Sequence, residues 1–267
     1  MNNNRKNHKL YIGLILAGLI VLLILAGLIR SPYPPQKMEA SLKLAGISAA
    51  HPMGCDQFGR DILSRVMIGA RTTFLIAFVT NAIGLFFGIL IGALTGYFGG
   101  FFDEILMRFN DVMLSFPSIL LALVLIALMG PGTYQVMIAM GIVFIPSYAR
   151  IVRSEFIRFR NMDYVLAIRL MGGSHLRIMF LHILPNVKGT ILTSLIIGFN
   201  NAVLCEAAMS FLGIGVQPPD ASLGLMLSEA QGFLFRAPSY ALLVGFVMIC
   251  MILSFSLLSD SLKEVQG

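Results

Sequence analysis

The sequence predicts an all-α integral membrane protein with six transmembrane helices. Of the 267 residues, 57% are hydrophobic and 12% are charged, and the mean hydropathy is +0.86. In soluble domains roughly a quarter of residues are charged, so this chain has too few charged residues for a soluble domain. Six apolar stretches are long enough to cross a bilayer, which takes about 20 helical residues. The Lys and Arg residues gather in the segments between those stretches.

The six spans must be helical, because lipid offers no hydrogen-bond partner to an open backbone. The first follows basic residues, as a signal peptide would, but its apolar run is too long for one. No small-residue cleavage site follows it, so it is predicted to be retained. The spans are predicted near Leu10–Ile29, Thr72–Tyr97, Ile105–Met129, Tyr134–Val152, Asn186–Phe211 and Tyr240–Leu262.

Six spans place both termini on the same side of the membrane, so the basic residues can indicate which side. With a cytoplasmic N-terminus, 12 of the 19 Lys and Arg residues lie inside and seven outside. This bias predicts a plasma membrane protein with cytoplasmic N- and C-termini. Because the basic residues are confined to these short segments, the net charge of +6 does not indicate nucleic acid binding.

Three polar segments separate the spans. Residues 30–71 and 213–238 are predicted outside, and the first opens with SPYPP, which cannot be helical through its prolines. Residues 153–184 form the longest inner segment. The predicted organisation is a tail, first span and outer loop over residues 1–71, followed by a core of five spans over residues 72–267.

The second span carries glycines at strict four-residue spacing, namely Gly84, Gly88, Gly92 and Gly96. On a helix they form a smooth stripe that another helix backbone can approach closely. The stripe is predicted to serve helix packing, within the chain or against another subunit, and the two roles are compatible.

The inner segment reads DYVLAIRLMGGSHLRIMFLHILPN from Asp163. Gly172 and Gly173 permit a sharp turn after a short helix, and Pro185 suits the first turn of the next span. The helix would expose Leu166, Leu170 and Met171, which need a covering partner. The alternative is that Arg169 and Arg177 hold the helix on lipid headgroups.

This segment resembles the cytoplasmic loop of binding-protein-dependent ABC transporter permeases. In that family an Ala-rich helix, a Gly and a later Ile-x-Leu-Pro recur at set spacing, and matching residues occupy those places here. Leu166 stands where the family usually has Glu, and Ile168 where it has a second Ala. The matching residues are Ala167, Gly172, Ile183, Leu184 and Pro185.

The resemblance is closest to the C-type permease of the dipeptide, oligopeptide and nickel group, and it extends over most of the chain. Five stretches match that group in the same order. Together they are a far more specific indication of the family than any one stretch alone. They are HPMGCDQFGRDILSRVMIGAR at 51–71, GYFGGFFDEILMRFNDVMLSFP at 96–117, GPGTYQVMIAMGI at 130–142, YARIVRSE at 148–155 and EAAMSFLGIGVQPP at 206–219.

The resemblance implies a type I ABC importer permease that translocates di- or oligopeptides, or alternatively nickel or a metal chelate. It implies a second permease, two ATPases and an extracytoplasmic solute-binding protein as partners. ATP and Mg would bind the ATPases, whereas this chain would bind no cofactor and catalyse no reaction. The chain has no GxxxxGK[ST] phosphate loop. The ATPase would grip the helix through Leu166, Ala167, Arg169, Leu170, Met171, Gly172 and Gly173.

Polar residues within spans are candidates for the solute path, because they are costly in lipid. Glu206 is predicted either to face a cationic group of the solute or to pair with Arg236. Asn200 and Asn201 are predicted to contact either solute or a neighbouring helix. Arg108 and Asp111 are predicted to pair on one helix face.

Other readings remain open at this point. His51, Cys55 and Asp56 fall short of a ligand set, so no metal site is predicted. An ion-coupled secondary transporter would favour inverted repeats with paired broken helices. The sequence shows neither feature. A membrane assembly factor without transport activity is a third reading.

Overall fold

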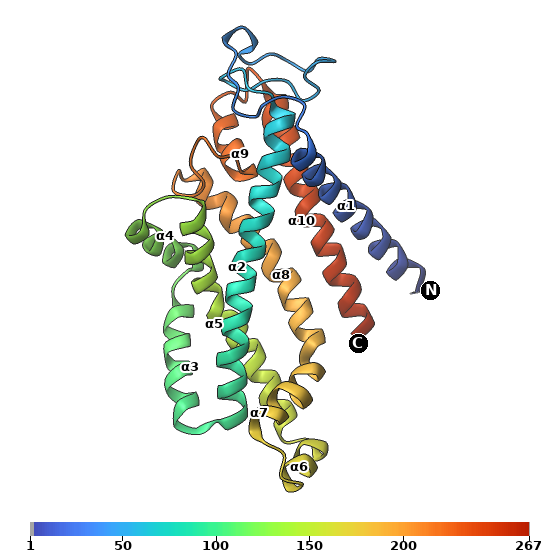
Figure 1. Ribbon diagram of the computed structural model, residues 1–267, viewed down its shortest axis with the longest axis vertical. Coiled ribbons are helices and arrows are strands. Elements are labelled where there is room, and N and C mark those ends of the chain that lie inside the picture. The colour runs from blue at the N-terminus through green and yellow to red at the C-terminus, as the bar shows by residue number, and fades with distance from the viewer. Residues whose placement is uncertain (1–2, 267) are drawn as a thin grey trace.

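The computed structural model describes residues 3–266, with side chains over residues 8–261. Regular structure in this part of the chain is helical, with one isolated β-bridge between Cys55 and Asp61. The molecule is elongated, with residues 30–61 at one end and the short helix α6 at the other (Figure 1). The predicted orientation also counts Arg5, Lys6 and Lys263, whose side chains lie outside the described part.

Five continuous helices and one bent pair are long and apolar enough to cross a bilayer. The prediction of an all-α membrane protein is therefore confirmed. The continuous helices are α1 (Asn3–Ile29), α2 (Ile62–Phe98), α5 (Thr133–Arg160), α8 (Leu184–Phe211), which short helical turns precede, and α10 (Pro238–Gln266).

The third span is not the single helix predicted over Ile105–Met129. It consists of α3 (Gly100–Ser115) and α4 (Ser118–Met129), which meet at an angle of 93°. Pro117 lies at the break, and Phe116 before it is extended, with φ −90° and ψ 141°. A proline disfavours helical backbone in the residue before it, so the helix ends there.

Helix α2 begins at Ile62, well before the predicted start at Thr72. The Asp61 side chain caps it by accepting a hydrogen bond from the Ser64 N–H at 2.8 Å. Arg65 is only 1% exposed, so this charged residue of the predicted loop is buried within a helix. The predicted domain boundary between residues 71 and 72 lies inside this helix.

Two other predicted segments are also more helical than expected. Helix α5 continues past Val152 to Arg160, so the inner segment starts later than predicted. The second outer segment contains α9 (Leu223–Gln231), whose Leu223 and Met226 are fully buried. These apolar side chains join the main hydrophobic core, which also includes α2, α5, α8 and α10.

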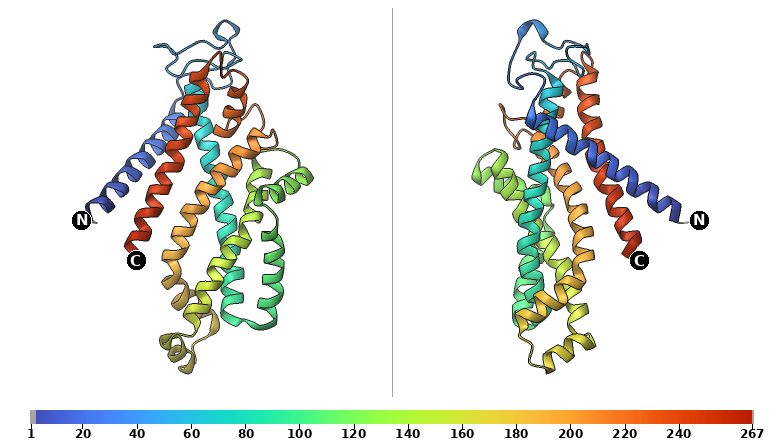
Figure 2. Two further views of the ribbon diagram at one scale, coloured as in Figure 1. Left: turned by 180° about the vertical axis from the view of Figure 1, so that it is seen from behind. Right: turned by 45° about the vertical axis from the view of Figure 1, so that its right-hand side comes forward.

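Helices α1 and α10 pack on one another and splay away from the rest of the bundle (Figure 2). Gly13 allows this contact, since a Cβ there would lie 3.2 Å from the Ser254 carbonyl oxygen. The start of α1 and the end of α10 lie near each other and away from residues 30–61 (Figures 1 and 2).

Candidate functional site

Helix α6 (Asp163–Leu170) lies at the end of the molecule opposite residues 30–61 (Figure 1). It ends in a turn in which the Gly173 N–H donates to the Ile168 carbonyl at 3.0 Å. Gly172 has φ +81°, a left-handed backbone conformation that residues other than glycine rarely adopt. The Gly-Gly pair therefore ends the helix and returns the chain to the bundle.

The two faces of α6 differ. Val165 is fully buried in the inner hydrophobic cluster, and Ile168 packs against that cluster. The other face exposes Leu166 by 41%, Leu170 by 89% and Met171 by 78%. An apolar surface of this kind on a projecting helix is typical of a protein interaction site.

Side chains from α2 hold this loop in place. Tyr97 Oη lies 2.9 Å from His175 Nδ1, and the Arg169 guanidinium lies 5.5 Å from the centre of the Tyr97 ring. Ala167 is exposed beside Arg169. The predicted docking residues therefore form one surface that is fixed to the C-terminal end of α2.

The loop returns through α7 (His175–Arg177) and a π-helical turn, Ile178–Ile183, into α8. Ile183 is fully buried, and Pro185 occupies the first turn of α8, as its sequence position suggested. Asn186 Nδ2 donates to the His182 carbonyl at 2.6 Å. Single π-helical turns occur frequently at functional sites.

The four glycines of α2 face α5. A Cβ on Gly92 would lie 2.5 Å from the Ala149 carbonyl oxygen, and one on Gly96 would lie 2.7 Å from the Arg153 carbonyl oxygen. Gly84 and Gly88 likewise lie against α5, at Phe144 and Tyr148 respectively. Of the two predicted roles, the stripe has the packing role within the chain.

Glu206 is enclosed. It is 0% exposed, and its carboxylate accepts hydrogen bonds from Thr73 Oγ1 at 3.0 Å and Ser210 Oγ at 2.7 Å. Thr73 Oγ1 in turn accepts a hydrogen bond from the Leu223 N–H at 3.1 Å. Glu206 thus joins α2, α8 and the start of α9, and among the described residues no ion pair links it to Arg236.

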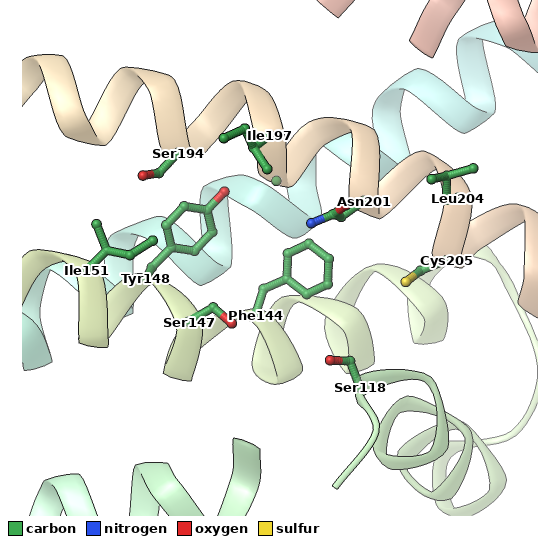
Figure 3. A pocket seen from close by; sticks show the side chains of 11 residues that line it. Ser118, Phe144, Ser147, Tyr148, Ile151, Ser194, Ile197, Asn201, Leu204 and Cys205 are labelled. Atoms are coloured by element: carbon green, nitrogen blue, oxygen red, sulfur yellow. The ribbon is translucent and has the colours of Figure 1, made fainter. Parts of the chain in front are cut away.

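The two asparagines of α8 separate. Asn201 is exposed and lines a cavity of about 420 Å³ between α5 and α8 (Figure 3). The Asn200 side-chain oxygen is buried without a hydrogen-bond partner among the described residues. Of the three residues predicted for a solute path, only Asn201 reaches this cavity.

The sequence interpretation missed the other polar residues of the cavity, which are Ser118 of α4, Ser147 and Tyr148 of α5 and Ser194 of α8. A signal was present for α8. Ser194, Gly198, Asn201 and Cys205 recur at intervals of three and four residues and so share one helix face.

The predicted pair between Arg108 and Asp111 is wrong. Arg108 pairs with Glu104 at 2.8 Å, one turn earlier on α3. Asp111 instead faces α5 and pairs with Arg150 at 2.6 Å. The spacing of i and i+4 that Glu104 offers is as favourable on a helix as the predicted spacing of three, and sequence alone does not show which acid is nearer.

His51 Nδ1 lies 2.8 Å from Asp61 Oδ1, and Cys55 is 1% exposed. Burial, followed by the nearby Asp61 and Asp56 carboxylates, raises the pKa of the Cys55 thiol. Among the described residues, no group of three or more His, Cys, Asp or Glu side chains is placed to hold a metal ion.

Comparison of the sequence with known proteins shows the family to which this chain is similar. Residues 88–266 match the family described as binding-protein-dependent transport system inner membrane component. The chain is 36% identical to a dipeptide transport system permease of Alkalihalophilus pseudofirmus, over 97% of this chain and 86% of the relative. It is 35% identical to a glutathione transport system permease of Pectobacterium atrosepticum, over 94% and 85% respectively.

Solved structures share the fold. A chain of the methionine ABC transporter MetNI in inward-facing conformations aligns with a TM-score of 0.64 and 17% identity, covering 76% of this chain and 96% of that one. A chain of an amino acid ABC transporter aligns with a TM-score of 0.58 and 22% identity, covering 76% and 94%. The predicted importer permease fold is thereby confirmed.

Proposed function

Because this chain belongs to the family of inner membrane components of binding-protein-dependent transport systems, we propose that it is a permease subunit of an ATP-driven importer of small peptides. It would act beside a second permease, two ATPases and an extracytoplasmic solute-binding protein. The observation that carries the proposal is the exposed apolar face of α6, formed by Leu166, Leu170 and Met171.

The α6 face suits a mechanical role. Val165 and Ile168 fasten the helix to the inner cluster, while Tyr97 and Arg169 connect it to α2. A force applied by an ATPase to α6 would therefore reach both α2 and α8. ATP and Mg would bind the ATPase, and this chain would move in response without catalysing a reaction.

The proposed orientation follows the predicted excess of basic residues inside. It places α6 and both termini in the cytoplasm and residues 30–61 outside, where the solute-binding protein would dock. These two surfaces lie at opposite ends of the molecule, as the proposal requires (Figure 1).

Relatives favour peptides as the solute. The proteins described above are named for transport of dipeptides and of glutathione, which is itself a tripeptide. None of those relatives is named for nickel, so we propose di- and tripeptides over nickel or a metal chelate.

The experiment is to replace Leu170 and Met171 together with Glu and to co-express the variant with the other subunits. Both side chains are more than three-quarters exposed, so this chain should fold normally. We expect the ATPases to be lost on purification in mild detergent and dipeptide uptake to stop. Met38→Glu is the control for ATPase retention alone, because Met38 is also exposed but lies in the outer segment, where the solute-binding protein and not the ATPase would dock. Retention of the ATPases together with normal uptake would contradict the proposal.

A further inference from the structure

The cavity between α5 and α8 has an uncharged wall in which polar groups stand among apolar side chains, including Ile197 and Leu204. Ser118, Ser147, Ser194 and Asn201 contribute hydroxyl and carboxamide groups to it, and Phe144 and Tyr148 contribute rings (Figure 3). Its lining includes no Lys, Arg, Asp or Glu side chain. Its volume of about 420 Å³ falls within the usual range for small-molecule sites.

Lipid is an unsuitable neighbour for the polar groups of this wall. Ser147 and Asn201 are exposed in the middle of membrane-spanning helices, where an unpaired polar group is costly in hydrocarbon. The outward side of α10 is different, since it exposes apolar side chains such as Leu242, Phe246 and Ile249. The polar part of the α5 and α8 face is therefore suited to water or solute, whereas the α10 face is suited to lipid.

The back of the cavity is firmly built. The Tyr148 hydroxyl donates to the Asn81 side-chain oxygen, and both residues are buried. Gly198 lies directly against this pair, since a Cβ there would overlap both oxygen atoms. Helices α2, α5 and α8 are thus locked together behind the polar wall, which holds its groups in fixed positions.

Hydroxyl and carboxamide groups both donate and accept hydrogen bonds, as the peptide group does. A wall of such groups can pair with the N–H and C=O groups of a peptide whatever its side chains are. An uncharged wall also gives no preference for acidic or basic side chains. This chemistry fits a solute path that must pass many different peptides.

We propose that this cavity is the solute-binding wall of the subunit, and that Asn201 and Ser147 bind the backbone amide groups of a small peptide during its passage. The inference rests on the proposed function and adds the residues and the mode of recognition. Glu206, which is enclosed by Thr73 and Ser210, has no part in it.

Cys205 lines the cavity and provides a natural probe. The complex of this chain with its partner subunits is reconstituted in vesicles, and dipeptide uptake is measured after treatment with N-ethylmaleimide. We expect uptake to fall in the wild type and to be spared in Cys205→Ser, while saturating dipeptide slows labelling of Cys205. Comparison with Cys205→Ser removes any effect of thiols elsewhere in the complex. Equal inhibition of both proteins, with no protection by dipeptide, would overturn the inference.

Substitution of Asn201 supplies the second measurement. Asn201→Leu should lower dipeptide uptake about tenfold, as expected for the loss of one hydrogen bond to the solute, and Asn201→Gln should restore most of it. The ATPases should copurify with both variants. Unchanged uptake in Asn201→Leu would also count against the inference while the proposed function stood. Absence of ATP-dependent dipeptide uptake in the wild-type complex would overturn the proposed function, and this inference with it.

Discussion

Arg60 of the segment 30–61 and Glu229 of α9 form a buried ion pair, with Arg60 Nη2 3.1 Å from a Glu229 carboxylate oxygen. Arg65 Nη2 approaches the same carboxylate at 3.3 Å, and Arg60 Nε lies 2.5 Å from Asp56. Tyr240 Oη donates to Glu229 at 3.1 Å. Two cations and two anions thus balance within one cluster that joins the segment 30–61, α2, α9 and α10.

The cluster predicts that Glu229→Ala strongly destabilises the protein. The substitution leaves Arg60 and Arg65 with Asp56 alone, and breaking a buried pair from one side costs about 3–5 kcal/mol. We expect a clear fall in the unfolding temperature in detergent. The control is Glu104→Ala, which removes an exposed pair with Arg108 and should change the unfolding temperature little. Equal effects of the two substitutions would contradict a structural role for the cluster.

The backbone conformation of Gly172 leads to a prediction about the turn after α6. Its φ of +81° disfavours a side chain, although nothing lies within 4 Å of a Cβ there. Gly172→Leu should therefore strain the backbone by about 1–2 kcal/mol without a clash, and shift α6. We expect weaker retention of the ATPases and slower uptake. Gly172→Asn is the matched control, because Asn tolerates left-handed backbone. If Leu and Asn behave alike, the conformation of this turn is not what positions α6.

Glu206 gives a prediction that differs from its interpretation as a solute contact. Glu206→Ala leaves the hydroxyls of Thr73 and Ser210 without their acceptor, at a cost of about 1–3 kcal/mol for each unsatisfied group. Glu206→Gln keeps one side-chain oxygen and should lower the unfolding temperature less. Uptake per folded complex should stay near normal in Glu206→Gln. A loss of uptake with unchanged thermal unfolding would instead return Glu206 to the solute path.

The sequence predicts the helices better than their ends. The spans are visible because each needs a long apolar stretch, a condition that the sequence alone reveals. The start of α2 is not visible in the sequence, because the burial of Arg65 depends on Glu229, which lies far away in the chain. The break in the third span is signalled by Pro117, but proline also occurs inside helices, as Pro146 does in α5.

The candidate site follows the same rule. The exposed face of α6 is predictable because Gly172 and Gly173 end a short helix whose apolar residues have nowhere to pack locally. The cavity is not predictable from the sequence, because it depends on how α8 is rotated against α5. Asn200 and Asn201 are adjacent and chemically identical, and only the packed structure shows that Asn201 reaches the cavity.

The glycine stripe carries the last prediction. Gly92→Ala should force α2 and α5 apart, because the new Cβ would lie 2.5 Å from the Ala149 carbonyl oxygen and 2.8 Å from Val152 Cβ. Overpacking of this kind costs about 1–3 kcal/mol, which should appear as a lower unfolding temperature. Gly18→Ala in α1 is the control, since nothing lies within 4 Å of a Cβ there.

Both substitutions make the same gain in helix propensity, about 1 kcal/mol, so the difference between them isolates the close contact. Tyr148 lies on α5 at the same interface, where it lines the cavity and bonds Asn81 of α2. Gly92→Ala should therefore lower dipeptide uptake as well as stability. If Gly92→Ala and Gly18→Ala unfold at the same temperature, α2 and α5 do not approach as closely as the structure places them.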